Sequence, residues 1–152
     1  MTNPPAPNFK LTAVPLYRER LMLAVGQGHD LAGRKEISQE ELGVSVYLDR
    51  LHCEFRSQLI RHFMDRNVVM RPRVQSERED WIQRLVAEGV GVCALPEFSK
   101  VVDGIVLKPV NGLDLSREIT LVAVSGSGNP REVRQIVDLA RKHDWNRISL
   151  GA

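Results

Sequence analysis

The order of hydrophobic patterns along these 152 residues predicts an α/β fold. Short apolar runs rich in β-branched residues alternate with segments in which apolar residues recur every three or four positions. Glycine and proline separate the two kinds of segment. Strands that alternate with helices are typical of layered α/β domains with a largely parallel sheet, and the length suits one domain.

The first third of the chain predicts a strand, a short helical turn and a second strand. Residues 1–10 form a proline-rich lead that we expect to be disordered, and 19–26 reads as the first strand. A polar loop follows. Ser38 and Glu41 then make a capping box that starts a short helical turn, and the β-branched residues of 44–48 predict a strand.

The middle of the chain predicts a second helix and an extended segment. The helix covers 54–66, and its apolar face comprises Phe55, Leu59, Ile60, Phe63 and Met64. Residues 68–74 are extended, and Pro72 within them favours an edge or the end of a strand.

A capped helix, a glycine turn and a buried strand follow. Ser76 is the expected N-cap of a helix that starts at 77, with Glu79 completing a capping box. Its apolar face comprises Trp81, Ile82, Leu85 and Val86. Gly89 is expected to end the helix in a left-handed conformation, and the apolar strand 90–95 stops at Pro96.

The last part of the chain predicts two strands and a helix. After a turn or short helix at 97–103, a strand runs over 104–110, and Asn111-Gly112 ends it. A further strand covers 119–124. Asn129 is the expected N-cap of the last helix, followed by Pro130 in the first turn, and its apolar face comprises Val133, Ile136, Val137 and Ala140.

The segment from Ser76 to Pro96 resembles the signature of the effector-binding domain of LysR-type transcriptional regulators. In that family a serine or threonine opens a helix, which ends in an "LVAAGxG" pattern before an "hxhLP" strand; here the matches are 85–91 and 92–96. Further matches lie at 14–25 ("PLxxExLxLV"), at 28–32 ("HPLA", with Asp30 in place of proline) and at 117–124 ("RxIxLV"). The resemblance runs from about Leu11 to His143.

The resemblance implies the two-lobed, periplasmic-binding-protein-like (type 2) fold. On this reading, 11–152 is a fragment of an effector-binding domain in which 27–116 is lobe II. The strands 19–26 and 117–124 are antiparallel hinge strands, and the helix at 129–144 is a remnant of lobe I. Family members begin with a DNA-binding helix-turn-helix and the first half of lobe I, to which no residues here correspond. We therefore expect a ligand-sensing regulatory domain without DNA-binding activity of its own.

Composition limits the partners and the compartment. A net charge of +2 and a pI near 8.7 are too mild to indicate nucleic-acid binding, so we expect no direct DNA contact. No apolar run reaches the roughly 18 residues of a membrane span, and no secretory leader is visible. Two cysteines do not make a disulfide scaffold, which predicts a cytoplasmic protein with reduced thiols. Hinge and helix surfaces left uncovered by the missing part of lobe I predict self-association.

The loop after the strand 44–48 contains the first candidate site. Ligands of open α/β sheets bind beyond the carboxyl ends of strands, where Arg50, His52 and Cys53 lie. A thiol at a helix N-terminus beside Arg50, His52 and Arg56 should have its thiolate favoured, which would suit oxidation to a sulfenic acid. The peroxide-sensing OxyR branch of the family carries its reactive cysteine here in a "GHCLR" run, and His52, Cys53 and Arg56 match it with one residue inserted.

The alternative interpretation of Cys53 is an ordinary half-buried loop cysteine. Sensors of the OxyR branch have a second cysteine along the following helix, where this chain has Ile-Arg-His-Phe at 60–63. Cys93 lies in an apolar strand and reads as a buried structural cysteine.

The start of the signature helix is the second candidate site. The resemblance implies that Ser76 and Glu77 face the cleft between the lobes, where an organic acid or a peroxide would be the effector. Helix N-termini suit anions, although Ser76 could equally be only a helix cap. The four histidines lack metal-ligand spacing, so we expect neither a metal nor a cofactor.

Two other classes of protein compete with this interpretation. A solute-binding protein would share the fold but would normally carry a leader peptide. A small α/β enzyme would need a nucleophile elbow, a phosphate-binding loop or paired carboxylates. None of these is visible, and Gly26-Gln27-Gly28 is too short for a dinucleotide fingerprint. We therefore expect no catalytic activity.

Overall fold

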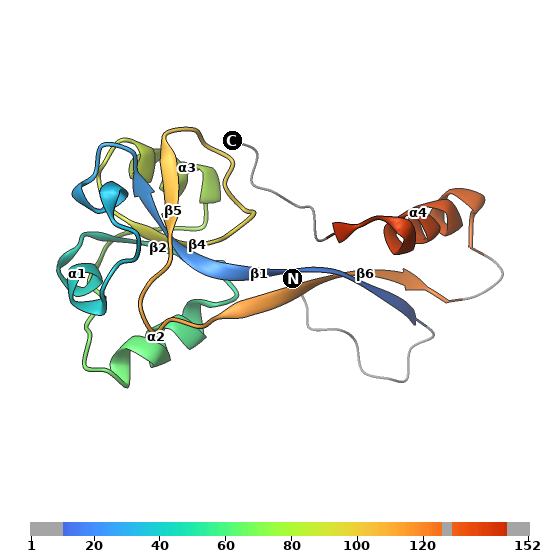
Figure 1. The fold of residues 1–152 in the computed structure, drawn as a ribbon, viewed down its shortest axis with the longest axis horizontal. Helices are drawn as coiled ribbons and strands as arrows, with labels where there is room; N and C mark the ends of the chain where they lie inside the picture. The colour runs from blue at the N-terminus through green and yellow to red at the C-terminus, as the bar shows by residue number, and fades with distance from the viewer. Residues whose placement is uncertain (1–10, 126–128, 146–152) are drawn as a thin grey trace. The chain divides into compact units, whose positions relative to one another are not determined.

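The computed structural model describes residues 11–125 and 129–145, which divide between two compact units (Figure 1). Unit 2 is Arg20–Ser116, and unit 1 combines Met1–Glu19 with Arg117–Ala152. The proline-rich lead at 1–10 lies outside the described residues. Among the described residues, no helix is long and apolar enough to cross a bilayer.

Strand β1 (Leu11–Gly26) is longer than the 19–26 predicted, and in unit 2 it is the central strand of a sheet in the order β4-β1-β5. The neighbours β4 (Cys93–Pro96) and β5 (Ile105–Lys108) both run antiparallel to it. The prediction of a largely parallel sheet is therefore wrong. The alternation of strands and helices does not reveal that the two later strands run back along the first.

One pair of strands in unit 2 is parallel. Strand β2 (Tyr47–Arg50) pairs with β3 (Pro72–Ser76), and their last residues, Arg50 and Ser76, are opposite each other. The predicted strands 44–48 and 68–74 each lie two to four residues too early. Val44 ends helix α1 (Gln39–Val44) instead of starting a strand.

Helices cover both faces of β2. On one side Tyr47 joins a core with Leu59 and Phe63 of α2 (Arg56–Met64), and on the other side Leu48 joins a core with Ile82 and other side chains of α3 (Glu79–Ala87). Alternate side chains of a strand point to opposite faces, so a strand covered on both sides is buried along its length. All four residues of β2 are buried, including the charged Asp49 and Arg50.

Several local predictions are confirmed. Ser38 caps α1, its Oγ accepting from the Glu41 amide at 3.1 Å while Glu41 reaches back to the Ser38 amide at 2.9 Å. Gly89 follows α3 with a φ of 75°, and Gly112 has a φ of 72° in the turn after β5. Both angles lie in the left-handed region that favours glycine.

The predicted cap of α3 is wrong. Ser76 is the last residue of β3, and α3 starts three residues later with Arg78 as its N-cap. Ser76 Oγ instead accepts a hydrogen bond from the Arg78 amide at 3.0 Å. The backbone of Ser76 belongs to the parallel ladder, and its side chain stabilises the turn that follows β3. Glu79 therefore does not complete a capping box with Ser76 and pairs with Arg50 instead.

The buried face of α3 differs from the predicted apolar face. Ile82 and Val86 are buried as expected, but Trp81 is 58% exposed beneath the Arg78 guanidinium, which lies 5.2 Å from its ring centroid. Gln83, which was not part of the predicted apolar face, is completely buried. Its amide nitrogen donates to the Ser99 carbonyl at 2.9 Å and its oxygen accepts from the Val101 amide at 2.9 Å. A buried glutamine that ties a loop to the helix is not visible in a hydrophobic pattern.

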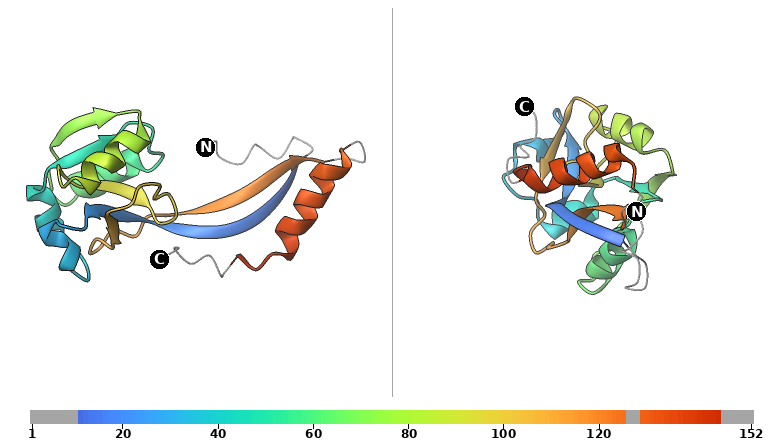
Figure 2. Two further views of the ribbon diagram at one scale, coloured as in Figure 1. Left: turned by 90° about the horizontal axis from the view of Figure 1, so that it is seen from above. Right: turned by 90° about the vertical axis from the view of Figure 1, so that its right-hand side faces the viewer.

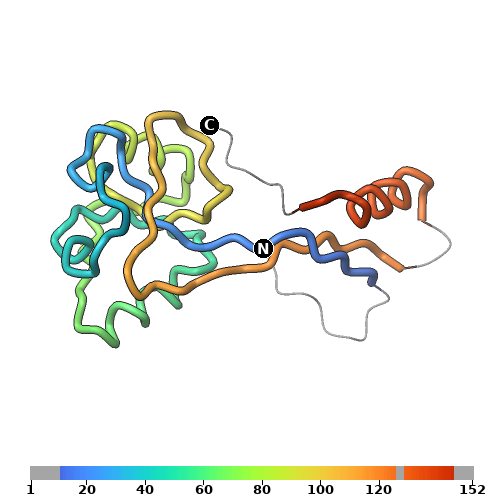
Figure 3. Tube along the Cα trace, viewed as in Figure 1, coloured from blue at the N-terminus to red at the C-terminus, as the bar shows by residue number. Residues whose placement is uncertain are grey.

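Unit 1 consists of a two-stranded ribbon and a helix (Figure 2). The first part of β1 pairs with β6 (Ser116–Val124), and Figure 3 shows the two segments side by side. Thr12 and Ser125 share a side-chain hydrogen bond at 2.9 Å, and Glu19 accepts from Arg117 at 2.6 Å. The order of these contacts makes the ribbon antiparallel, as predicted for the hinge strands.

The register of that ribbon differs from the prediction. Residues 21–24 of β1 were expected beside 117–124 but pair with β4 and, from Leu23 onward, with β5. The strand β6 instead lies along the preceding part of β1. Helix α4 (Arg131–Lys142) packs Val137 and Ala140 against Val14 of the ribbon. Its N-cap is Pro130 and not Asn129 as predicted. The side-chain amide of Asn129 donates to the Val124 carbonyl.

Candidate functional site

The predicted site residues of unit 2 meet where the parallel strands β2 and β3 end. Arg50 and Ser76 are partners in the ladder, and the Leu51 amide donates to the Ser76 carbonyl at 3.1 Å. The exposed side chains of the two following loops approach each other, with His52 Nε2 3.5 Å from Glu77 Oε2. The parallel register therefore brings together residues that are 25 or 26 positions apart in the sequence.

Cys53 lies in the turn that leads from β2 to α2. Its amide donates to the Arg50 carbonyl at 3.1 Å, and its carbonyl accepts from the Arg56 amide at 3.0 Å. The side chain is 9% exposed and joins the core that contains Tyr47 and Phe55. Both cysteines of the chain lie within the described residues and are free thiols.

The guanidinium of Arg50 is turned into the protein. One nitrogen donates to the Ala94 carbonyl at 2.8 Å and another to Glu79 at 2.6 Å. Burial is the largest single influence on the pKa of Arg50 and acts to lower it, but the hydrogen bond to Glu79 and the nearby acidic groups together raise this pKa, so the group stays charged. Among the described residues, Arg50 Nε is one of two buried side-chain nitrogen or oxygen atoms without a hydrogen-bond partner.

Arg56 is also engaged by a carboxylate. It grips Asp49 with Nε and Nη2, the latter at 2.8 Å from Oδ2, and Gln75 donates to the same carboxylate at 3.0 Å. Its hydrogen bond to Asp49 raises the pKa of Arg56. The two arginines predicted to activate Cys53 are thus each paired with an acid, as a buried or half-buried charge requires.

Sequence reasoning missed Asp49, Gln75 and Glu79, which hold the site in place. Asp49 is buried inside a strand, where an acid is usual only if it has a partner. That partner, Arg56, comes from the next helix. The acid at 49 within an apolar run was the available signal, but sequence alone does not indicate which of the nearby arginines it meets.

Cys93 lies one residue from the Ala94 carbonyl that Arg50 grips. It is fully buried at the start of β4, and burial raises the pKa of its thiol to about 12. Burial likewise raises the pKa of Tyr47 above its ordinary value. Among the described residues, no group of histidine, cysteine and acidic side chains could hold a metal ion.

Antiparallel connecting strands and an α/β unit with polar groups at the carboxyl ends of parallel strands define a ligand-binding module of the periplasmic-binding-protein-like (type 2) class. The family model described as "LysR substrate binding domain" matches residues 1–145. The chain therefore belongs to the LysR substrate-binding domain family.

Individual relatives agree with this assignment. The "Hydrogen peroxide-inducible genes activator" of Dickeya chrysanthemi is 26% identical over 136 residues, which cover 86% of this chain and 44% of that relative. The chain thus spans less than half of its length.

Solved structures show the same fold. The CcmR regulatory domain of Synechocystis PCC6803 in complex with 2-PG has a TM-score of 0.70 at 17% identity, covering 92% of this chain and 70% of that one. The effector-binding domain of QuiR in complex with shikimate has a TM-score of 0.67 at 18% identity, covering 88% and 65%.

Proposed function

We propose that the chain is the effector-sensing part of a LysR-type transcription regulator and that its effector is a small organic anion. Unit 2 would then correspond to lobe II, and the ribbon and α4 of unit 1 to the hinge and a part of lobe I. Effector binding would act on DNA only through a helix-turn-helix elsewhere in the regulator. Such coupling works by shifting a two-state element.

The observation that carries this proposal is the placement of Arg50 opposite Ser76 at the carboxyl ends of two parallel strands. Ser76 Oγ already accepts a hydrogen bond from the Arg78 amide, so its hydroxyl proton remains to be donated to a ligand. His52, whose Nε2 lies 3.5 Å from Glu77 Oε2 in the neighbouring loop, would be a second donor. The CcmR and QuiR domains were solved with 2-PG and shikimate, which supports an anion as the class of ligand.

Calorimetric titration of the 152-residue chain with shikimate and with 2-PG tests the proposal, and methyl shikimate serves as an uncharged control. We expect saturable binding of at least one anion at concentrations up to about 10 mM. Ser76→Ala should weaken it about tenfold, because a hydrogen bond to a charged group contributes roughly 1.5 kcal/mol or more. The matched variant Ser57→Ala removes an exposed hydroxyl from α2 and should leave binding unchanged. Equal affinities for the two variants would refute the site.

Thiol-based peroxide sensing at Cys53 is the second candidate function. The observations in its favour are the likeness to a peroxide-inducible activator and the free thiol at the start of α2. The thiol would take one oxygen of hydrogen peroxide as the O–O bond breaks, giving a sulfenic acid and one molecule of water. Arg50 and Arg56 are each already paired with an acid, Glu79 and Asp49.

A dimedone-type probe for sulfenic acid decides between sensing and an ordinary cysteine. A sensor would be labelled within minutes of mild peroxide treatment in the wild type and in Cys93→Ser, and labelling would disappear in Cys53→Ser. If labelling is no faster than that of free cysteine, the redox function fails and the anion proposal stands unaffected.

A further inference from the structure

A groove of about 700 Å³ lies between helix α1 and the segment that joins α2 to β3, entirely within unit 2. Gly43 and Val44 of α1 line one side, and Val68 and Val69 of the joining segment line the other. The two sides meet closely, since a Cβ at Gly43 would lie 3.2 Å from Val68 Cγ1. Small-molecule sites have volumes of roughly 300–1,000 Å³, so the groove is large enough to hold a ligand.

The groove lies at the opposite end of the parallel strands from the candidate effector site. The ladder of β2 and β3 begins with Tyr47 opposite Pro72 and ends with Arg50 opposite Ser76. The residues that line the groove include Val46, directly before the first of these pairs. The groove is therefore separate from the site described above.

The valine side chains give the groove an apolar surface that is exposed to water. Val44 is 88% exposed and Val69 is 65% exposed. Val46 and Val68 are half-buried, and each packs against one of the two cores of unit 2. A hydrocarbon that covered the exposed valines would remove apolar surface from water, which favours binding in proportion to the area covered.

Two arginines that line the groove have no ion-pair or hydrogen-bond partner for their side chains among the described residues. Arg71 and Arg73 flank Pro72, and side chains two positions apart on an extended chain point to the same face. Glu40 is the one acid among the described residues that line the groove, so two positive charges face one negative charge. Each guanidinium offers a planar fork of donors that fits a carboxylate.

We propose that this groove is a second ligand site and that its ligand is a small amphipathic carboxylate, a carboxylate at the end of an alkyl chain. The carboxylate would accept hydrogen bonds from Arg71 and Arg73, and the alkyl chain would cover Val44 and Val69. Shikimate and 2-PG are strongly polar anions without such a chain, so neither should occupy the groove. The inference goes beyond the proposed function and does not depend on it.

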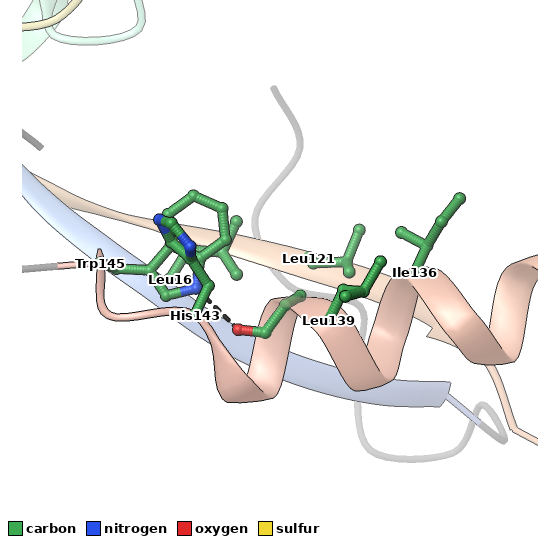
Figure 4. Close-up of a pocket in the computed structure, with 7 residues that line it drawn as sticks. Leu16, Leu121, Ile136, Leu139, His143 and Trp145 are labelled. Atoms are coloured by element: carbon green, nitrogen blue, oxygen red, sulfur yellow. Dashed lines mark hydrogen bonds between the residues drawn. The ribbon is translucent and has the colours of Figure 1, made fainter.

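Charge distinguishes this groove from an apolar hollow in unit 1 (Figure 4). Leu16 and Leu121 line that hollow together with Trp145, whose indole nitrogen donates to the Ala140 carbonyl at 2.7 Å. Among the described residues around it there is neither an arginine nor a lysine. A ligand attracted by its hydrocarbon alone should bind in the hollow as readily, whereas an alkyl carboxylate should prefer the groove beside α1.

Titration of the ¹⁵N-labelled 152-residue chain with octanoate tests the site, with 1-octanol as the uncharged control. We expect saturable shifts of the amides of 43–46 and 67–71 at octanoate concentrations up to about 5 mM. Binding of 1-octanol at the same amides should be at least about tenfold weaker, because it cannot pair with the arginines. Saturable octanoate shifts only at 51–53 and 76–78 would place octanoate at the effector site and would overturn this proposal.

A pair of double variants tests the charges. Arg71→Gln with Arg73→Gln should weaken octanoate binding about tenfold or more, since hydrogen bonds to a charged group are lost. Arg84→Gln with Arg131→Gln removes two exposed arginines outside the groove and should leave binding unchanged. All four positions are exposed, so the amide spectra should show that both variants are folded.

A pair of single variants tests the apolar contact. Val44→Asn should weaken octanoate binding about threefold or more, whereas Val101→Asn, at a position that is 71% exposed and outside the groove, should not change it. No saturable shifts at the groove, equal affinity for 1-octanol, or equal losses in a variant and its control would each overturn the proposal. The response of 51–53 and 76–78 to shikimate or 2-PG tests only the proposed function, so the two proposals fail separately.

Discussion

At the scale of single residues, Gly91 shows how closely the chain packs beside β2. A Cβ at this position would lie 2.4 Å from the Val46 carbonyl oxygen and 3.2 Å from Leu48 Cγ. Gly91→Ala should therefore lower the free energy of unfolding by about 1–3 kcal/mol, the usual cost of overpacking. Urea denaturation measures it. Gly33→Ala, where nothing lies within 4 Å, is the control, and equal losses in both variants would contradict the packing described.

The buried arginine of the site should matter more to stability than an exposed one. Arg50→Ala removes the donors to Ala94 and Glu79, and we expect a loss of about 2 kcal/mol in the free energy of unfolding. Arg20→Ala breaks an ion pair with Glu97 whose arginine is 60% exposed, and it should cost less than about 1 kcal/mol. Thermal and urea denaturation of the two variants give the comparison, and a reversed order would contradict it.

Cys93 should make stability fall at high pH. Its thiol titrates near pH 9 in the unfolded chain and at about 12 in the fold, so between these values only the unfolded chain releases the proton. The free energy of unfolding should then fall by up to about 1.4 kcal/mol per pH unit above pH 9 from this group alone. Urea denaturation at pH 8, 9 and 10 should show a steeper decline for the wild type than for Cys93→Ala. Parallel declines would show that Cys93 is not the cause.

The role of a residue was predictable from sequence where it depends on neighbours in the chain. It was not predictable where the partner comes from another element. The Ser38–Glu41 capping box and the left-handed Gly89 involve neighbours in the chain, and both are confirmed. The partner of Arg50 is Glu79, 29 residues away, and that of Asp49 is Arg56 across a turn. Predicting the Arg50–Glu79 pair would require the register of β2 and β3 in advance, and predicting the Asp49–Arg56 pair would require the path of the turn between β2 and α2.

At the scale of elements, two serines that look alike in sequence should differ in their effect on stability. Both precede a glutamate by three residues, but only Ser38 caps a helix. Ser38→Ala should cost about 1 kcal/mol, and Ser76→Ala less than about 0.5 kcal/mol. Denaturation curves of the two variants decide it. A larger loss in Ser76→Ala would favour the cap predicted from sequence.

The positions of the elements along the chain were predicted better than their pairing. Hydrophobic spacing located the segments that became α2, α3 and α4 to within a few residues. It did not reveal that β1 starts at Leu11, because its first residues are only partly buried and alternate weakly. The antiparallel neighbours of β1 come from 93–96 and 105–108, and such distant pairing leaves no local signal.

At the scale of the whole molecule, the order of weak motifs was more informative than any one of them. The match of the family model over residues 1–145 confirms the resemblance found from the segments around 14–25, 76–96 and 117–124. The resemblance to the family did not predict the hydrogen bonds and ion pairs of the site. The loop that follows β2 is flanked by two ion pairs, Arg50 with Glu79 and Arg56 with Asp49, which the motifs do not indicate.

The central claim is that an organic anion binds where β2 and β3 end. Titration of the ¹⁵N-labelled chain with shikimate or with 2-PG, followed through its backbone amides, locates the contact directly. We expect at least one of the two anions to cause saturable shifts, largest at residues 51–53 and 76–78. The amides of 67–71 in the same unit serve as an internal control and should move little. Saturable shifts elsewhere, or no shifts at these six residues with either anion, would contradict the account.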